Sequence, residues 1–324
     1  MHEVTELKRF SKLYPWLFSL VLLAFSAYAL LDTFVIRRVY TTVEPTAPEA
    51  AAAQIPAVTE QSRTVCLSGS RSTEAETESG QAASAIRTEN SYSDGSVSVS
   101  LQTYRAYNTT IYVADVTVAS PEALQTAFAW NSFGRNVTAA TSATAGNTGA
   151  VLAVNGDNYG SREKGYVIRN GVLYRDAAAR DQEDLVVWAD GSFSIVSESE
   201  VTAQALLDAG AQQVFSFGPG LLENGEIIVG ARDEVDRAMV SNPRTAVAVV
   251  EPGHYLLAVS DGRSDESEGL TLYELAEFLR SLGAQTAYNL DGGGSSTMVF
   301  LGNVVNTPSG RGGERAVTDI LYFA

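Results

Sequence analysis

The first hydrophobic segment of the chain is long and almost free of charge. No residue from Trp16 to Leu31 is charged, and after Asp32 the apolar run resumes with Phe34–Ile36. The stretch 14–36 is long enough to cross a bilayer as one helix, which takes about 20 residues. Three basic residues precede it and two follow, which favours a cytoplasmic N-terminus. We therefore predict a short cytoplasmic tail over residues 1–13 and a single transmembrane helix over 14–36.

A cleavable signal peptide is the alternative interpretation of this segment. Ala27-Tyr28-Ala29 has the small-x-small form of a cleavage site. We favour the anchor because the apolar run continues beyond this motif through Leu30 and Leu31. With either interpretation the remainder of the chain is exported, so a location on the extracytoplasmic side of the cell membrane is predicted.

Residues 37–95 have a pattern typical of a flexible spacer. Prolines at 45, 48 and 56 are scattered among Ala, Thr and Glu, and residues 68–80 are rich in Ser, Thr and Glu. Such a composition buries too little apolar surface to offset the entropy of the chain.

From residue 96 onward the pattern changes to strands separated by turn signals. Val97, Val99 and Leu101 alternate with polar residues, and residues 111–118 form a β-branched run. Asn-Gly and Asp-Gly dipeptides between apolar segments predict hairpins. These turn dipeptides are Asn170-Gly171, Asp190-Gly191 and Asn224-Gly225.

Few helices are expected in this region. Leucines at i, i+3, i+7 and i+10 predict an amphipathic helix over Thr271–Leu282, ended by Gly283. Shorter helices are predicted over Val201–Ala209 and, from the Ser-Pro-Glu start, over Ser120–Trp130. The predicted fold class is therefore α+β: one mixed, largely antiparallel sheet domain over residues 96–324, preceded by a single N-terminal transmembrane helix.

Composition narrows the function classes. The 324 residues include one cysteine and two histidines, too few for an intrachain disulfide framework or a zinc module of Cys and His. The formal net charge of −16 argues against a nucleic-acid partner, since phosphate backbones require clusters of Lys and Arg. A share of 45% apolar residues excludes a disordered acidic tail.

The strongest local motif follows the predicted strand at 286–290. The strand directs Asn289 and Asp291 to one side, since side chains alternate. Three glycines then allow a sharp turn and a close approach of the backbone to a ligand. Hydroxyls follow, so the segment is a candidate oxyanion nest rather than a loop without a ligand. Its candidate site residues are Asn289, Asp291, Gly292, Gly293, Gly294, Ser295 and Ser296.

A second set of candidates lies at the ends of other strands. Asn155, Gly156 and Asp157 follow a buried-looking strand, where an Asx turn without a ligand is the alternative. Guanidinium groups suit phosphate oxygens, although surface ion pairing is the alternative for any single arginine. The arginines and their neighbouring carboxylates are Arg244, Asp261, Arg263, Glu314 and Arg315.

The scarcity of histidine assigns acid and base chemistry to carboxylates. No Ser-His-Asp arrangement and no G-x-S-x-G nucleophile elbow occur in the chain. Paired carboxylates are the usual apparatus of glycoside cleavage. We predict no cofactor and no metal ligands, and the alternative that carboxylates bind Ca²⁺ or Mg²⁺ stays open.

The C-terminal half, from about Ile111 to Ala324, resembles the phosphodiester glycosidase family. Seven motifs in order carry the resemblance, and at one of them the chain has Asn-Gly-Asp-Asn-Tyr where the family usually has Asn-Gly-Gly followed by an aromatic residue. The motifs are Ala153–Gly156, Ser216–Pro219, Asn242–Ala246, Asp261–Arg263, Gly269–Leu272, Asn289–Ser296 and Glu314–Val317.

The resemblance implies hydrolysis of the glycosidic C–O bond of a sugar-1-phosphodiester, in cell-envelope or exopolysaccharide glycans. It implies Arg244 and Arg315 as phosphate ligands and Asp291 as nucleophile or base, with Glu314 as the second candidate. It also implies that Asn155 and Asn289 orient sugar hydroxyls and that amides of the glycine loop hold phosphate oxygens. Two alternatives remain open. One is a non-catalytic protein that binds or assembles glycans, and the other is a metal-dependent phosphodiesterase that cleaves the P–O bond.

Overall fold

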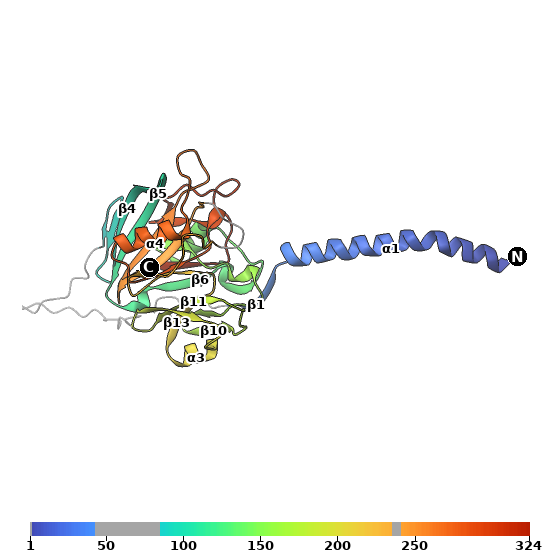
Figure 1. Ribbon diagram of the computed structural model, residues 1–324, viewed down its shortest axis with the longest axis horizontal. Helices are drawn as coiled ribbons and strands as arrows, with labels where there is room; N and C mark the ends of the chain where they lie inside the picture. Colours follow the sequence, from blue (N-terminus) through green and yellow to red (C-terminus); the bar gives the residue numbers. More distant parts are fainter. Residues whose placement is uncertain (1, 43–84, 235–240) are drawn as a thin grey trace, which may run out of the picture.

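The computed structural model describes residues 2–42, 85–234 and 241–324, and it has two visibly different parts (Figure 1). A long helix, α1 (His2–Phe34), projects from a globular body made mainly of strands. Within it, Tyr14–Thr33 has a mean hydropathy of 1.7 and is long and apolar enough to cross a membrane. The helix predicted from the apolar run is therefore present.

The body is built around one large antiparallel sheet of nine strands. Its strand order is β15-β14-β18-β16-β17-β5-β4-β3-β2. The pairings are set by hairpins and by β-branched apolar runs, in which one face of each strand packs on the core. Its strands are β2 (Ile86–Arg87), β3 (Ser91–Ser93), β4 (Val97–Ala106), β5 (Thr109–Val118), β14 (Gly220–Glu223), β15 (Glu226–Ile227), β16 (Thr245–Glu251), β17 (His254–Ser260) and β18 (Thr286–Asn289).

Three smaller sheets complete the described body, and all their pairings are antiparallel. The first has the order β20-β19-β8-β21-β6, the second β10-β9-β13-β11-β12, and the third joins β1 to β7. Their strands are β1 (Arg38–Thr42), β6 (Gln125–Phe128), β7 (Ser132–Arg135), β8 (Leu152–Asn155), β9 (Val167–Arg169), β10 (Val172–Arg175), β11 (Glu183–Trp188), β12 (Phe193–Ser197), β13 (Ala211–Phe215), β19 (Met298–Phe300), β20 (Asn303–Val304) and β21 (Asp319–Phe323).

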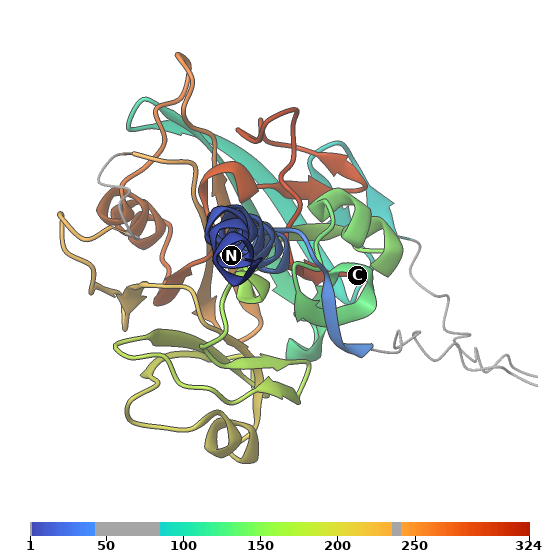
Figure 2. The same cartoon turned by 90° about the vertical axis from the view of Figure 1, so that its right-hand side faces the viewer.

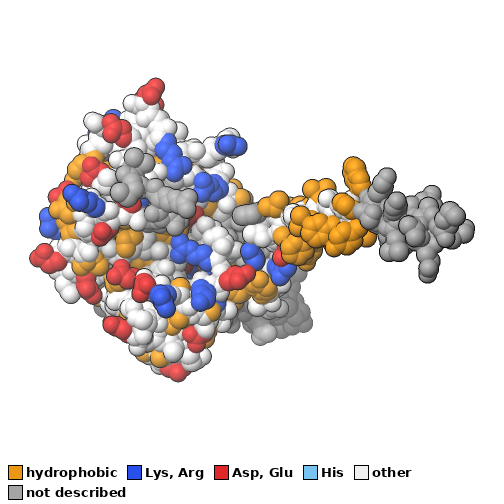
Figure 3. All heavy atoms as spheres, turned by 45° about the vertical axis from the view of Figure 1, so that its right-hand side comes forward, with side chains coloured by type: hydrophobic (Ala, Val, Ile, Leu, Met, Phe, Trp, Pro, Cys, Tyr) orange, Lys and Arg blue, Asp and Glu red, His pale blue; other side chains and the backbone are white. Residues whose placement is uncertain are grey.

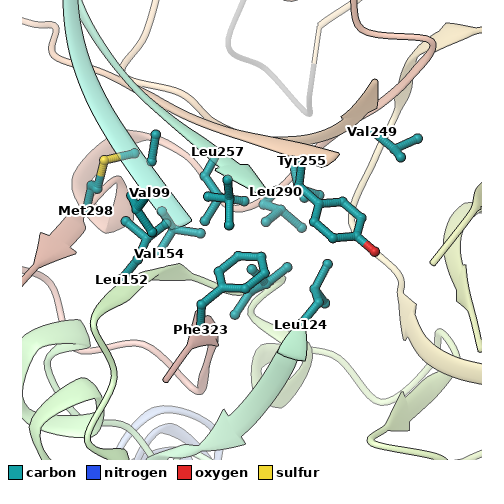
Figure 4. Close-up of a cluster of buried hydrophobic side chains, with 14 of the residues drawn as sticks. Val99, Leu124, Leu152, Val154, Val249, Tyr255, Leu257, Leu290, Met298 and Phe323 are labelled. Atoms are coloured by element: carbon teal, nitrogen blue, oxygen red, sulfur yellow. The ribbon is translucent and has the colours of Figure 1, made fainter. Parts of the chain in front are cut away.

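The largest hydrophobic core lies between the nine-stranded sheet and the smaller sheets. Figure 4 shows side chains from several sheets meeting there, among them Leu257, Leu290 and Phe323. All three are fully buried. Because β8 and β18 both contribute to this core, the residues that follow their last positions are held in a fixed relation to each other.

The helices predicted at 271–282 and 201–209 are confirmed. α4 (Leu272–Ser281) begins at a capping box in which Thr271 and Glu274 exchange hydrogen bonds, and its apolar face covers the large sheet. α3 (Ala203–Asp208) packs on β10 and β13. The remaining helical elements are α2 (Thr141–Thr148), η1 (Pro121–Ala123), η2 (Ala129–Asn131), η3 (Tyr159–Ser161) and η4 (Gly293–Ser295).

The helix predicted over Ser120–Trp130 is wrong. Only η1 is helical at its start, where the Ser120 side chain caps nothing, and the next residues form β6. β6 alternates between half-buried and buried side chains and pairs with β21. Pairing with a buried strand outweighs the local Ser-Pro-Glu start signal, which supports only one turn of helix.

The spacer predicted over residues 37–95 lies mostly outside the described residues. Its two described ends are strands: β1 pairs with β7, and β3 pairs with β4 in the large sheet. Tyr92 of β3 is buried in the main core. The compact body therefore includes residues before 96, and a strand directly after α1.

Candidate active site

The candidate site forms where β8, β16 and β18 end or begin next to one another. Asn155 at the end of β8 accepts a hydrogen bond at 2.8 Å from the hydroxyl of Thr245, the first residue of β16. Its amide nitrogen donates to the carbonyl oxygen of Asp291 at 2.6 Å. Asn155 is fully buried, so it positions the Asp291 backbone rather than facing a ligand.

The three glycines after Asp291 each lie against a different segment of the chain. A Cβ on Gly292 would lie 2.8 Å from the carbonyl oxygen of Pro243, directly before Arg244. A Cβ on Gly293 would lie 3.0 Å from an Arg263 guanidinium nitrogen, and one on Gly294 would lie 2.8 Å from an Arg315 guanidinium nitrogen.

Their lack of side chains therefore allows three arginines from distant parts of the sequence to gather around one loop. The arginine motifs that the sequence analysis treated separately form one cluster.

The three arginines differ in their availability to a ligand. Arg263 and Arg315 are exposed, and Arg315 donates a long 3.4 Å hydrogen bond to the hydroxyl of Ser295. Arg244 is 4% exposed and forms an ion pair with Glu234. Burial lowers the pKa of Arg244 and the Glu234 carboxylate opposes that change. The exposed pair therefore presents the unneutralised positive charge at the loop.

Asp291 is an acidic group held inside this positive cluster. Burial raises its pKa, and a hydrogen bond with Ser295 and the charges of Arg315 and Arg162 act in the opposite direction. Its backbone N–H donates to the Gly156 carbonyl at 3.2 Å, so the β8 end positions this residue at both backbone groups. A buried carboxyl with a perturbed pKa beside unpaired cations is typical of a functional site.

Three polar atoms along the same segment are buried without a hydrogen-bond partner among the described residues. They are Asn289 Oδ1, Ser296 Oγ and Thr297 Oγ1. The amide nitrogen of the same Asn289 side chain donates to the Gly218 carbonyl at 2.8 Å. Because buried polar groups are nearly always satisfied, three exceptions within nine residues favour a ligand site here.

A cavity of about 650 Å³ lies beside the site. The Gly218-Pro219 segment that holds Asn289 forms one wall, and Glu234, the partner of Arg244, forms another. Arg162 lies at its edge, with its guanidinium group over the Phe217 ring at 4.9 Å. The other polar residues that line the cavity are Asp181, Gln182, Glu183, Arg232 and Asp233.

Asp157 belongs to a buried ion cluster instead of facing this cavity. Arg169 lies 2.8 Å from the carboxylates of both Asp157 and Asp319, and all three side chains are at most 2% exposed. Burial, then the Asp157 charge, raises the pKa of Asp319, and Arg169 opposes this. Asp157 also accepts from the backbone N–H of Ser216 at 2.8 Å. Its oxygens are therefore occupied by the fold.

A buried acidic pair lies next to this cluster. The hydroxyl of Ser216 donates to Glu198 at 2.9 Å, and Asp184 lies close by without an exposed surface. Burial and then the Glu198 charge raise the pKa of Asp184 to about 9, so Asp184 is protonated at neutral pH.

Two further predicted site residues have structural partners. Both Glu314 oxygens accept hydrogen bonds from Ser142 in the first turn of α2, at 2.9 Å from the backbone N–H and 2.5 Å from the hydroxyl. Asp261 accepts from the Thr307 N–H at 2.7 Å and from Tyr112. Glu314 thus stabilises a helix N-terminus, and Asp261 anchors the loop that carries Arg315.

Sequence reasoning did not select Arg162, Arg169, Asp319 or Glu234. Arg169 carried the clearest signal, because it ends the apolar run Tyr166–Ile168 and a charge inside a buried strand requires a partner. Arg162 and Glu234 lie in loops, and no local sequence pattern indicates which residues these loops contact. Within the described ranges, no three His, Cys, Asp or Glu side chains come together as a metal-binding group.

Comparison with known proteins agrees with the motif order. Residues 148–324, more than half of the chain, match the phosphodiester glycosidase family. This chain belongs to the phosphodiester glycosidase family. The matched range contains the glycine loop, the three arginines beside it and the buried Asp157–Arg169–Asp319 cluster.

Relatives within the family are similar over limited ranges. The SPbeta prophage-derived uncharacterized protein YomE of Bacillus subtilis is 33% identical over 180 residues, 54% of this chain and 28% of that protein. Mouse N-acetylglucosamine-1-phosphodiester alpha-N-acetylglucosaminidase is 46% identical over 70 residues, 22% of this chain and 13% of that enzyme. The match thus spans less than a third of either relative.

A solved structure shares the fold. The catalytic domain of the zebrafish N-acetylglucosamine-1-phosphodiester alpha-N-acetylglucosaminidase, auto-inhibited by its pro-peptide, superposes with a TM-score of 0.54 at 22% identity. The superposition covers 70% of this chain and 82% of that one. The α+β class with largely antiparallel sheets is therefore confirmed.

Proposed function

We propose that this chain is a membrane-anchored hydrolase that cleaves the glycosidic C–O bond of a sugar-1-phosphodiester. The observation that carries the proposal is the convergence of Arg244, Arg263 and Arg315 on the glycine loop next to Asp291. A phosphodiester carries one negative charge, and exposed guanidinium groups beside backbone glycines suit its oxygens. Family membership supports the reaction class.

In this mechanism Arg263 and Arg315 bind the phosphodiester, and Arg244, which is paired with Glu234, packs against the glycine loop at Gly292. Asp291 acts at the anomeric carbon as nucleophile or base, where positive charge develops in the transition state. Overall, water adds its oxygen to the anomeric carbon while the C–O bond to phosphate breaks. The bonding electrons leave with the phosphate monoester, and the proton of the water passes to Asp291 and then to solvent.

A base or nucleophile must be ionised, and burial raises the pKa of Asp291. We therefore expect kcat/KM to increase with pH through an apparent pKa above the ordinary carboxyl value of 3.8. A rate that instead decreases through that pKa would reassign Asp291 as a general acid.

For α1 we propose an uncleaved, single-pass anchor with the body on the extracytoplasmic side. The helix continues without a break through the Ala27–Ala29 motif to Phe34. Basic residues 37 and 38 then mark the end of the apolar segment. Action on cell-envelope or exopolysaccharide glycans stays a prediction.

The test is the position of bond cleavage in the full-length protein. UDP-N-acetylglucosamine in ¹⁸O-water should release N-acetylglucosamine carrying the label, together with unlabelled UDP, at the same rate with and without EDTA. Label in the phosphate, or sugar 1-phosphate as product, would support a phosphodiesterase instead. Glycan binding without turnover of any sugar-1-phosphodiester would support the non-catalytic alternative.

A further inference from the structure

The anchor helix is bonded directly to the body. The amide of Asn136 donates to the carbonyl oxygens of Thr33 and Ile36 at 3.2 and 3.1 Å, at the end of α1. A few residues later β1 pairs with β7 over four residue pairs. The body is therefore held against the helix end, so a bilayer that contains α1 lies at the face from which the helix projects.

That face carries the exposed residues expected at a bilayer surface. Figure 2 looks along α1 onto it. Val35, Ile36, Val39 and Tyr40 follow the helix, and each is 41–63% exposed. Figure 3 shows Lys and Arg side chains near the base of the helix, with acidic side chains beside them. Arg38 forms an ion pair with Asp32 there. Apolar and tyrosine side chains mixed with basic groups are typical of the interfacial zone of a membrane.

A second cavity, of about 360 Å³, opens beside β1. Its walls combine four aromatic rings with three arginines, a composition unlike the acidic walls of the larger cavity. These residues are Tyr40, Phe133, Tyr159, Tyr174, Arg135, Arg162 and Arg175. Arg135 forms an exposed ion pair with Glu163, whereas Arg175 is occupied by backbone carbonyl groups.

Arg162 connects the two cavities. It lines both, and its charge acts on Asp291. The larger cavity offers carboxylates, an amide and the Phe217 ring, which suit the hydroxyls and the apolar face of a sugar. The smaller cavity offers aromatic rings and the guanidinium group of Arg162, which makes no ion pair within the described residues; these suit a phosphate joined to a hydrocarbon.

We propose that the substrate is a lipid-linked sugar phosphate in the bilayer that holds α1, with the first carbons of its lipid chain in the β1 cavity. This inference rests on the proposed function and specifies its substrate class. The sugar lies in the larger cavity, the phosphate lies at the arginine cluster, and the lipid chain passes Tyr40 into the membrane. Cleavage adds water to the anomeric carbon and leaves the lipid phosphate monoester in the bilayer.

The test uses the full-length protein in nanodiscs and two diesters of N-acetylglucosamine 1-phosphate, one with dodecanol and one with ethanol. We expect kcat/KM for the dodecyl diester to be at least about tenfold higher. Replacing Tyr40 by alanine should reduce that ratio about fivefold or more. Tyr107→Ala, which removes an exposed tyrosine on the β4–β5 turn, should leave the ratio unchanged.

The dodecyl diester partitions into the nanodisc equally for the unmodified protein, Tyr40→Ala and Tyr107→Ala. A difference in the ratio between these proteins therefore reports the contribution of the cavity. Equal kcat/KM values for the two diesters in the unmodified protein would overturn the proposal, as would a ratio that Tyr40→Ala leaves intact.

If neither diester is cleaved, the proposed function fails, and binding then tests the cavity separately. Full-length protein with Asp291→Asn should bind the dodecyl diester at least about tenfold more tightly than the ethyl diester. Adding Tyr40→Ala should remove that preference. Equal affinities in the Asp291→Asn protein would overturn the lipid assignment without reference to turnover.

Discussion

Two clusters that contain arginine have opposite surroundings in this protein. Arg169 is buried, and two carboxylates and two backbone carbonyls occupy its guanidinium group. Arg263 and Arg315, by contrast, are exposed and make no ion pair within the described residues. Arg263 donates to the neutral Asn242 amide oxygen at 2.9 and 3.2 Å, so its charge is not neutralised. The same side chain thus neutralises buried charge in one cluster and keeps its net charge in the other.

The difference shows that the interaction partners of an arginine, more than its residue type, decide whether it stabilises the fold or is available to a ligand. A buried arginine costs free energy unless it is paired, and removing one partner leaves the others uncompensated. An exposed arginine without an ion pair contributes little to folding, so a ligand can use its charge. Asp157 and Asp291 divide in the same way: Asp157 is bonded on both oxygens, and Asp291 lies beside arginines that make no ion pair.

The largest effect is expected for Asp291→Asn, which keeps the shape and removes the ionisable group. Turnover of a sugar-1-phosphodiester should decrease about 10²–10⁴-fold, as for loss of an acid–base or nucleophilic group. The melting temperature should stay nearly unchanged, because the backbone bonds from Asn155 and to Gly156 remain. Asp265→Asn, an exposed carboxylate near Arg263, is the matched control. Full activity of Asp291→Asn would remove this residue from the mechanism.

Arg169→Met tests the buried cluster and should act on stability. It leaves the Asp157 and Asp319 carboxylates without their cation, and we expect a loss of about 3–5 kcal/mol in the free energy of unfolding. Urea denaturation measures it. Arg135→Met breaks the exposed pair with Glu163 and should cost at most about 1 kcal/mol. Similar losses in both variants would contradict the distinction between the clusters.

Arg315→Gln tests the exposed cluster and should act on activity. A charge-assisted bond to a phosphate oxygen contributes about 1.5–3 kcal/mol, so kcat/KM should decrease about 10–100-fold with little change in stability. Arg311→Gln removes an exposed arginine from the same loop and should retain near-normal kcat/KM. If both variants lose activity equally, the general charge of the loop, rather than the position of Arg315, would explain the effect.

The smallest effect is expected for Asp184→Asn, and it depends on pH. The pKa of Asp184 is about 9 in the folded protein and 3.8 ordinarily, so between these values the folded state holds one proton more than the unfolded state. Stability from this group therefore decreases as pH rises from about 4 toward 9. Asparagine cannot ionise, so the free energy of unfolding of Asp184→Asn, relative to the unmodified protein, should rise by about 1.4 kcal/mol from pH 5 to pH 6, the change for one proton over one pH unit. Equal pH slopes for both proteins in urea denaturation would refute this assignment.

The local sequence pattern correctly predicted the turns and helices that depend on neighbouring residues. The Asn-Gly and Asp-Gly turns lie between the strands that they were expected to join, and the α4 periodicity matches its buried face. The segment Ser120–Trp130 failed for the opposite reason. Its strand forms because β21, almost 200 residues later, pairs with it. No residue near β6 in the sequence indicates this pairing.

For the candidate site, too, the sequence predicted the local features and missed the contacts between distant segments. Three glycines, an acid and the arginine motifs were visible as separate signals, because each has a local chemical signature. Their assembly around one loop was not visible, since it depends on which strand ends meet. Nor could the sequence identify the partners of Arg169, because distant segments bring Asp157 and Asp319 to it.

The sequence by itself determined the apolar helix, the turn positions, the capped α4 helix and the family motifs, because those depend on neighbouring residues and their periodicity. Tertiary structure alone decided that Asp157, Asn155 and Glu314 hold the fold, and that Arg263 and Arg315 are exposed at the glycine loop that follows Asp291. The physical reason is that burial and charge pairing depend on contacts between segments far apart in the chain, which only the packed sheets bring together.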